Sequence, residues 1–334
     1  MVKGFIPFAT AQAAQAERLE QAIAAVGDQV RAAQQRGALA GPGPIFLGIG
    51  ASFAAAAAAV WTLRARKIHA WRLNAGDYPI PFPKTEQSYI GVSQSGRSTE
   101  TLTVLRSLEA RQCIAVVNVT PSPIADFAAA TIALGNLPDS YASTVGYTAT
   151  AAALGMIADA WDGGTFDPGW ADLPVAFRAL EAVLAARGQC LATKLGGAES
   201  VDYAGAGPSV GSAEVGSLLL REVARVPATG FSTRQYLHGA MESAGRGAHV
   251  LIGDARELGV AQTLARSGHK AILVTALDVA EEPLLDVVRL PAVPPAQRAV
   301  LEALVMQHLA VETAGLRGID PDTFVFHHTD TKVA

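Results

Sequence analysis

The sequence predicts an α/β protein made of two domains in tandem, each a parallel sheet covered by helices on both faces. Three observations predict this fold. The chain has 334 residues, of which half are hydrophobic and 17% are charged, so two domains of ordinary size can each bury a core. Short, continuously apolar runs alternate with helical patterns, which is typical of parallel strands buried on both faces. The alternation occurs twice, which indicates an internal duplication.

The first half begins with a long helical pattern. Residues 10–36 carry apolar side chains at helical spacing, and Gly41–Pro44 ends the pattern. Four apolar runs then predict strands, each followed by a helix. The predicted strands are 45–49, 88–92, 112–119 and 131–134, and the helices that follow them are 51–66, 98–110, 122–129 and 143–161.

The second half follows a linker predicted from Asp162 to Pro174. Its expected extended segments are 200–204, 228–232, 249–252, 271–275 and 287–290, with helices at 209–225, 257–268 and 296–314. The whole pattern predicts four parts of the chain: an N-terminal helix in 1–40, a first domain in 41–165, a second domain in 175–318, and a C-terminal tail in 319–334.

Composition excludes several classes of protein. The net charge is −4 and no basic block is present, so we expect no nucleic-acid partner. The N-terminus lacks the pattern of a signal peptide, and the apolar run from Ala51 to Trp61 is too short to cross a bilayer. We therefore expect a cytoplasmic protein that does not bind membranes. The two cysteines, Cys113 and Cys190, have apolar neighbours, which favours buried free thiols over a disulfide.

The most informative segment runs from Ile90 to Thr101. A buried strand leads into a loop of hydroxyl residues, and Ser98 is placed to cap the helix that follows. Ligands bind at the carboxyl ends of parallel strands, where free N–H groups at a helix start attract anions. Gly96 allows close approach of the backbone. Taken alone, the segment is equally consistent with an ordinary capped turn.

The sequence excludes two well-known kinds of nucleotide-binding loop. The segment is not followed by the Gly-Lys-Ser/Thr of a Walker loop. The turn Gly48–Gly50 lacks the third glycine of a dinucleotide fingerprint, so a Rossmann-type oxidoreductase is not expected.

The segment SQSGRSTET, Ser93–Thr101, resembles the phosphate loop of the sugar isomerase (SIS) family, S-x-S-G-x-[ST]-x-[DE]-T. Gly48–Ser52 resembles the turn after that family's first strand, and Asn118 fits its third strand. The resemblance is greatest to the isomerase half of glucosamine-6-phosphate synthase and its stand-alone relatives. It implies two flavodoxin-like SIS domains and a bound sugar phosphate. The implied phosphate and sugar contacts are Ser52, Ser93, Gln94, Ser95, Ser98 and Ser143.

The same resemblance implies two catalytic residues, Glu222 and His238. Synthase-type isomerases carry K-E near a helix end and E-L-K-H-G sixteen residues on, matching Arg221-Glu222 and Gln235–Gly239 here. In that family the glutamate moves the proton between C1 and C2 of the open sugar. The histidine helps to open the ring and is contributed across a dimer interface, so the resemblance also implies a homodimer with the active site at the subunit interface. The apolar neighbours of Glu222 would raise its pKa, which suits a base working near neutral pH.

The tail departs from the family pattern. Gly318–Asp322 resembles the family's G-x-[DN]-x-D stretch, after which the synthase places a lysine that reaches the sugar carbonyl. That position is Thr329 here, and Lys332 lies three residues further on. The candidates for tail contacts over the active site are therefore Lys332, His327 and His328. Adjacent histidines rarely chelate one ion, so no metal site is expected.

Further departures put the synthase reaction in doubt. The chain shows no glutaminase domain with its nucleophilic cysteine, Arg97 replaces the acid usual in the phosphate loop, and Val145 replaces an expected lysine. We therefore expect aldose/ketose isomerisation through an enediol, either of a sugar phosphate alone or of an amino-sugar 6-phosphate with deamination or deglycation as a further step, and no cofactor. The alternative is a sensor that binds phosphosugars without turnover.

Overall fold

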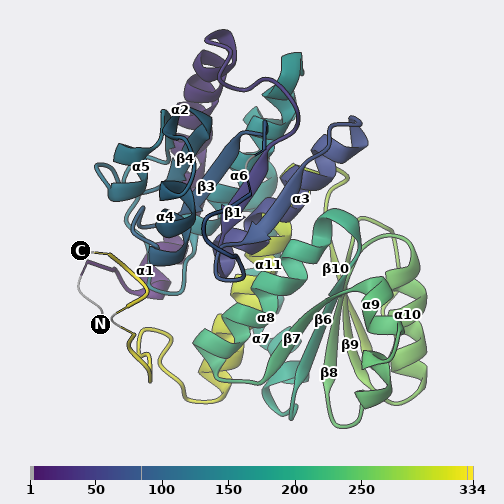
Figure 1. The fold of residues 1–334 in the computed structure, drawn as a ribbon. Helices are drawn as coiled ribbons and strands as arrows, with labels where there is room; N and C mark the ends of the chain where they lie inside the picture. The colour runs from purple at the N-terminus through teal and green to yellow at the C-terminus, as the bar shows by residue number, and fades with distance from the viewer. Residues whose placement is uncertain (1–3, 84, 329, 334) are drawn as a thin grey trace. The chain divides into compact units, whose positions relative to one another are not determined.

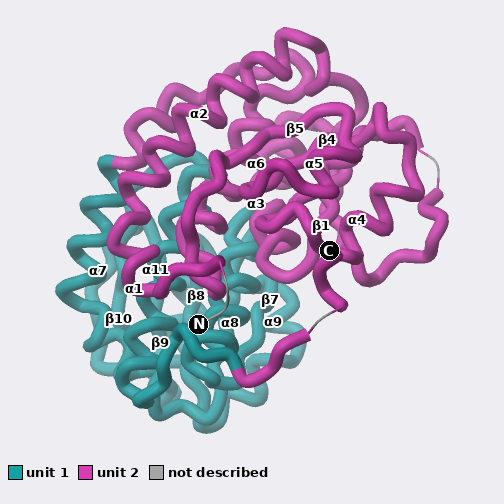
Figure 2. Tube along the Cα trace, turned by 90° about the vertical axis from the view of Figure 1, so that its left-hand side faces the viewer, with its two compact units in different colours: residues 1–2, 175–324 teal, residues 3–174, 325–334 magenta. Residues whose placement is uncertain are grey.

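The computed structural model describes residues 4–83, 85–328 and 330–333. Thr329, the position of the synthase lysine, lies outside the described residues. The chain forms two compact units, coloured separately in Figure 2. Unit 1 contains residues 175–324, and unit 2 contains the described residues up to 174 together with those from 325 onward. The C-terminal segment therefore packs with the N-terminal half of the chain.

Unit 2 is built on a five-stranded parallel sheet. Its strands are β1 (Ile45–Gly48), β2 (Trp71–Asn74), β3 (Tyr89–Ser93), β4 (Cys113–Val117) and β5 (Ala130–Ala133). Their spatial order is β2-β1-β3-β4-β5, so the chain reverses its direction of winding between β1 and β3. This reversal is the topological switch point, beside which open sheets of this class bind ligands.

Helices cover both faces of this sheet (Figure 1). They are α1 (Phe8–Ala13), α2 (Gln15–Gln35), α3 (Ala51–Ala65), α4 (Thr99–Arg106), α5 (Pro123–Phe127) and α6 (Val145–Ala160). Helix α6 packs against α2 and α3, and α4 packs against α5. All but one of the side chains of α6 are buried, which explains its almost wholly small and apolar sequence.

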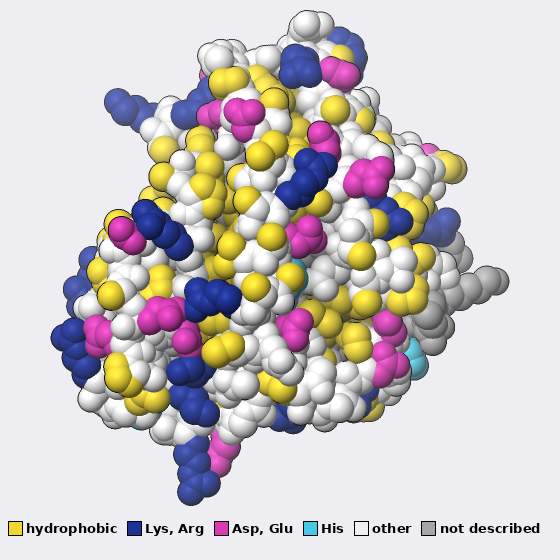
Figure 3. Space-filling model, turned by 180° about the vertical axis from the view of Figure 1, so that it is seen from behind, with side chains coloured by type: hydrophobic (Ala, Val, Ile, Leu, Met, Phe, Trp, Pro, Cys, Tyr) yellow, Lys and Arg dark blue, Asp and Glu magenta, His cyan; other side chains and the backbone are white. Residues whose placement is uncertain are grey.

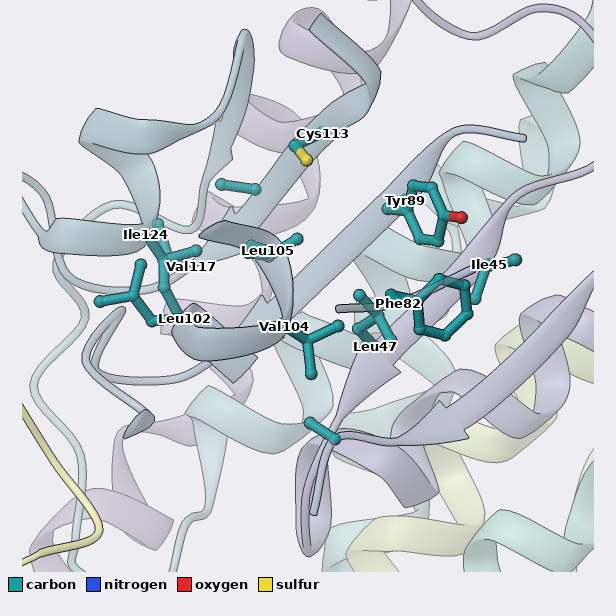
Figure 4. Packing of buried hydrophobic residues seen from close by; sticks show 12 residues of the cluster. Ile45, Leu47, Phe82, Tyr89, Leu102, Val104, Leu105, Cys113, Val117 and Ile124 are labelled. Carbon is teal, nitrogen blue, oxygen red and sulfur yellow. The ribbon is translucent and has the colours of Figure 1, made fainter. Parts of the chain in front are cut away.

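One face of the sheet is filled by a single apolar cluster, shown in Figure 4. Alternate residues of each strand point to this face, because successive side chains of a strand lie on opposite sides. Leu102 and Leu105 of α4 and Ile124 of α5 complete the cluster from the helix layer. Its strand residues include Ile45, Leu47, Tyr89, Cys113, Ala115 and Val117.

Unit 1 repeats this architecture. Its strands are β6 (Val201–Gly205), β7 (Ala228–Ser232), β8 (Ala248–Ile252), β9 (Lys270–Thr275) and β10 (Leu285–Arg289), and its helices are α7 (Leu173–Gly196), α8 (Val210–Ala224), α9 (Thr233–Leu237), α10 (Arg256–Arg266) and α11 (Pro295–Leu316). The order β10-β9-β8-β6-β7, taken from the other edge, matches that of unit 2. The predicted tandem of doubly wound parallel sheets is confirmed.

Three of these elements were not predicted from the sequence: β2, α7 and the short helix α9. Strand β2 lies at the edge of its sheet with Trp71 exposed, so it lacks the continuously apolar run by which buried strands were identified. Helix α7 begins at Leu173, inside the predicted linker. This helix carries both buried and exposed side chains along its length. An ion pair between Lys194 and Asp286, whose nitrogen and oxygen lie 3.3 Å apart, joins it to β10.

Several surface properties bear on the expectations from composition. Helix Pro295–Leu316 is the one helix in the described residues long and apolar enough to cross a membrane, but 72% of its most apolar window is buried inside the structure.

Both cysteines are free; Cys113 is buried, whereas Cys190 is exposed, so its predicted burial is wrong. On the face drawn in Figure 3, basic side chains lie among acidic ones.

Candidate active site

The serine loop, Ser93–Thr99, joins the carboxyl end of β3 to the start of α4. The hydroxyls of Ser93 and Ser98 lie 2.8 Å apart and form a hydrogen bond with each other. Ser98 precedes α4, but its side chain makes no capping hydrogen bond, so the predicted capping role of its hydroxyl is wrong. The pairing instead holds two hydroxyl groups together at the start of a helix, where the helix dipole favours an anion.

Gly96 locks this loop against the next one. Its φ is +64°, and an added Cβ would lie 2.0 Å from the Oγ atom of Ser122. The Gly96 carbonyl also accepts a hydrogen bond from the N–H of Ile124 at 3.1 Å. Ser122 is 2% exposed, and its buried hydroxyl makes no hydrogen bond within the described part of the chain. Only glycine fits this position in this conformation.

Ser52 and Ser95 lie at the same edge of the sheet. Ser52 is in the first turn of α3, which follows β1, and β1 pairs in register with β3. The Oγ atom of Ser95 accepts a hydrogen bond from the N–H of Arg97 at 3.3 Å. The serine-bearing turns after β1 and β3 therefore lie at one edge of the sheet, although Ser52 and Ser93 are 41 residues apart in sequence.

A buried carboxylate, Asp139, organises the loop that carries Ser143. It is 4% exposed, and the hydroxyl of Ser143 donates to its Oδ2 atom at 2.6 Å. The side-chain amide of Gln94, from the serine loop, donates to the same oxygen at 3.2 Å. The remaining donors are the backbone N–H groups of Ser140, Thr144 and Gly146 and the hydroxyl of Thr144. Asp139 therefore ties two predicted ligand contacts, Gln94 and Ser143, to one charge.

The tail runs along the serine loop as an antiparallel segment. Lys332 pairs with Ser98, the N–H of Thr99 donates to the carbonyl of Thr331 at 3.1 Å, and the N–H of Val333 donates to Arg97 at 2.9 Å. The Lys332 ammonium lies 5.4 Å and 5.7 Å from the ring centroids of Phe5 and Tyr141. Partial desolvation lowers the pKa of Lys332.

The other two tail candidates are placed differently. His327 and His328 are both exposed, and both precede the segment that pairs with the loop. Of the three candidates, Lys332 is therefore the one for which the structure gives a contact with the serine loop. Among the described residues, no three His, Cys, Asp or Glu side chains are grouped to hold a metal ion.

Glu222 lies in the last turn of α8 in unit 1. Neighbouring residues of the helix, Leu219, Leu220, Val223 and Ala224, are all buried. Burial of the carboxyl group raises its pKa from 4.5 to about 7. A carboxyl group with that pKa can take up and release protons near neutral pH.

His238 ends the short helix α9 of unit 1 and is exposed. Two contacts hold this helix. The Ser232 hydroxyl accepts from the N–H of Gln235 at 3.3 Å, and the buried Tyr236 hydroxyl lies 2.9 Å from Nδ1 of His249. The conformation of the segment that carries His238 is therefore set by buried neighbours, while its imidazole remains accessible.

Two residues at the carboxyl edge of the unit 2 sheet, Asp139 and Ser122, were not predicted from the sequence to belong to the site. Asp139 is an acidic residue in a loop, and nothing in its neighbourhood distinguishes it from a solvated aspartate. Ser122 was expected only as the start of a helix. In both cases the signal is a partner distant in sequence, Gln94 for Asp139 and Gly96 for Ser122.

No family model matches the chain. A search of curated proteins finds the glutamine–fructose-6-phosphate aminotransferase (isomerizing) of Bradyrhizobium diazoefficiens, 28% identical over 257 residues. The match covers 70% of this chain and 42% of that relative, so the chain spans well under half of the curated protein it resembles.

Solved structures share the fold over almost the whole chain. The C-terminal domain of glucosamine-fructose-6-phosphate aminotransferase from Francisella tularensis has a TM-score of 0.80 at 19% identity, covering 94% of this chain and 97% of that one. This chain has the fold of a sugar-phosphate isomerase. Tagatose-6-phosphate ketose/aldose isomerase from Escherichia coli has the same fold, with a TM-score of 0.78 at 17% identity, covering 96% of each chain. Glucosamine-6-phosphate deaminase from Thermotoga maritima has it too, with a TM-score of 0.73 at 17% identity, covering 95% of this chain and 99% of that one. The resemblance to SIS-domain proteins inferred from the motifs is confirmed.

Proposed function

We propose that this protein binds a sugar phosphate at the carboxyl edge of the unit 2 sheet and moves a proton between C1 and C2 of the open-chain sugar. The observation that carries the proposal is the paired hydroxyls of Ser93 and Ser98 at the start of α4, beside the switch point of the sheet. Hydroxyl donors and a helix start together suit a phosphate.

In this proposal Glu222 is the base. An enediol route needs one group that removes a proton from one carbon and returns it to the next. The raised pKa of Glu222 supports this role, because the carboxylate and the carboxylic acid are both populated near pH 7. His238 would protonate or deprotonate the ring oxygen. Its exposure is consistent with action on a sugar bound by a second copy of the chain, and we include that homodimer in the proposal.

The finer part of the proposal concerns the sugar. We favour an amino-sugar 6-phosphate: moving its proton from C2 to C1 gives an imine at C2, which water hydrolyses to the ketose phosphate and ammonia. The support is that the chain resembles a glutamine–fructose-6-phosphate aminotransferase (isomerizing) and a glucosamine-6-phosphate deaminase. Lys332, whose backbone pairs with Ser98 and whose amine is partly desolvated, is the candidate to contact the sugar carbonyl.

The test is solvent exchange. The protein would be incubated in heavy water with a panel of sugar 6-phosphates and amino-sugar 6-phosphates, and deuterium entry at C1 and C2 followed by NMR. We expect exchange with at least one compound, and Glu222→Gln should slow it by about 10²–10⁴-fold, the usual contribution of a positioned base. Glu199→Gln, an exposed carboxyl group of the same unit, should leave the rate unchanged.

The other outcomes are informative too. Ammonia released in step with exchange would identify a deaminase, and exchange alone would identify a plain isomerase. Binding without exchange across the whole panel would point to a phosphosugar sensor and overturn the catalytic roles. Light scattering of the purified protein tests the homodimer directly, and a monomer would remove the cross-subunit role of His238.

A further inference from the structure

The N-terminal arm, residues 4–7, lies against the loop that carries Ser143. The N–H of Ile6 donates a hydrogen bond to the carbonyl of Asp139 at 3.1 Å. Phe8, the first residue of α1, is fully buried and fixes the point at which the arm leaves the body of unit 2. The arm therefore has a defined place beside this loop.

Two aromatic rings meet where the arm reaches the loop. Phe5 belongs to the arm and Tyr141 to the loop, and their ring centroids lie 5.1 Å apart with the ring planes at 87°. This edge-to-face arrangement is one of the favourable geometries of aromatic pairs. Both residues are half-buried, so part of each ring remains accessible for a further contact.

The tail makes that further contact. The Lys332 ammonium lies 5.4 Å from the ring centroid of Phe5 and 5.7 Å from that of Tyr141, distances at which a ring attracts a cation. The backbone of the same lysine pairs with Ser98. One tail residue therefore joins the serine loop to the arm and to the loop of Ser143, and all these segments belong to unit 2.

The rings attract this ammonium without accepting a hydrogen bond from it. An ammonium carries three N–H donors, and an aromatic face has no lone pair to accept them. Among the described residues, burial alone lowers the pKa of Lys332, and no carboxylate opposes it. The residue as a whole is exposed, so a ligand on the serine loop can reach its ammonium. An oxygen of that ligand would offer the acceptor that the rings lack.

We propose that Phe5 and Tyr141 are positioning residues for the tail: their rings hold the Lys332 ammonium beside the serine loop in the free protein and release it to an oxygen of the bound sugar. The N-terminal arm is then part of the machinery that places the tail. This inference rests on the proposed function, which puts the sugar phosphate on the serine loop and assigns the sugar carbonyl to Lys332.

The experiment observes the lysine directly. Isotope-labelled formaldehyde and a borohydride convert lysines to dimethyl-lysines, which keep their positive charge and give separate methyl signals in NMR. Lys332→Arg identifies the signal of interest by removing it. In the free wild type this signal should lie upfield of that of the exposed Lys67, because methyl groups above an aromatic face are shielded.

Three variants test the rings one at a time. Phe5→Leu and Tyr141→Leu should each move the Lys332 signal downfield, toward that of an exposed lysine. Phe166→Leu is the matched control, because it removes a ring of unit 2 that lies under another cation, Arg31, at 5.0 Å, and it should leave the Lys332 signal in place. An unchanged Lys67 signal checks that each variant is folded.

Two ligands test the release. The sugar phosphate that wild type binds most tightly in the panel above should move the Lys332 signal downfield, whereas inorganic phosphate should leave it unchanged. An equal movement with inorganic phosphate would overturn the assignment of the ammonium to the sugar. A signal that stays upfield with the sugar phosphate bound would show that the rings hold the tail only structurally, and would overturn the release.

The ring contact can also fail by itself. A Lys332 signal among those of the exposed lysines in free wild type would overturn the inference, as would an upfield signal that neither leucine variant moves. A wild type that binds no sugar phosphate would overturn the proposed function instead. The two failures are distinguishable, because the ring contact is measured in the free protein.

Discussion

The two sheets have the same strand order, but the polar side chains at their carboxyl edges have different partners. In unit 2, Ser93 and Ser98 bond to each other, and Ser122 and Oε1 of Gln94 are buried without a partner in the described residues. In unit 1, Ser209 and Ser212 at the start of α8 both donate to Glu302 of α11, at 2.7 Å and 2.6 Å.

Glu302 is itself held from the other side. Arg298 donates to it at 2.7 Å and also pairs with Asp254, which follows β8. A carboxylate of the protein thus takes the place at the unit 1 edge that we assign to the ligand's anion at the unit 2 edge. The comparison teaches that a shared fold supplies donors at both edges, and that the two edges differ in which donors an internal anion engages. At the unit 1 edge Glu302 engages the serine hydroxyls at the start of α8, whereas at the unit 2 edge Asp139 engages Gln94 and Ser143 while Ser93 and Ser98 bond to each other.

The largest effect is expected from removing that internal anion. Glu302→Ala leaves Arg298 with one partner fewer and two buried hydroxyls unpaired, which should lower the free energy of unfolding by about 3–5 kcal/mol in a urea titration. Inorganic phosphate should raise the melting temperature of this variant more than that of wild type. Glu199→Ala, which breaks the exposed pair with Arg246, should cost less than about 1 kcal/mol. A comparably small loss for Glu302→Ala would remove the basis of the comparison.

At the unit 2 edge, Gly96→Ala should disturb the loop. The left-handed backbone and the contact with Ser122 should cost about 1–3 kcal/mol of stability and weaken sugar-phosphate binding at least tenfold. Gly37→Ala has a similar φ of +73° and no atom within 4 Å of its added Cβ, so it carries the backbone strain without the contact. If the two variants bind the ligand equally well, the packing of Gly96 on Ser122 does not shape the site.

Burial raises the pKa of both Glu222 and Glu302, but Arg298 and two serine hydroxyls oppose the rise at Glu302, whereas at Glu222 burial acts alone and raises the pKa to about 7. The exchange rate should therefore rise about tenfold between pH 6 and pH 8, as the carboxylate forms. Below pH 7 the folded state binds more protons than the unfolded state, so the free energy of unfolding should fall as pH rises from about 4.5 to about 7. Glu222→Gln should abolish that fall. A rate profile that levels off near pH 5 would contradict the assignment of Glu222 as the base.

The smallest effect is expected for Ser98→Ala. Loss of its hydrogen bond to Ser93 should cost about 1 kcal/mol, seen as a fivefold to tenfold weaker affinity for the sugar phosphate by calorimetry. Thr103→Ala, on the exposed side of the same helix, is the matched control and should bind as wild type does. Equal affinities for the two variants would exclude the Ser98 hydroxyl from the phosphate contacts.

Much of the fold could be predicted from sequence, because buried strands and amphipathic helices have a local signature. The strand β4 and the helix α8 were placed within a few residues of their bounds. Strand β2 was missed, since an edge strand that is half exposed has no continuous apolar run. Ser98 was placed before α4, but its hydroxyl bonds to Ser93 rather than to the helix, a preference that depends on how closely the strand and the helix approach.

By itself, the sequence determined the alternation of strands and helices, the duplication, and the serine loop with its glycine, because each depends on residues near one another along the chain. Only the tertiary structure decided which carboxylate each serine and amide meets. Asp139 lies 45 residues from Gln94, and Glu302 lies 93 residues from Ser209. Such pairs form when packed strands and helices bring distant loops to one edge, and the free energy of each hydrogen bond depends on burial that no local pattern records.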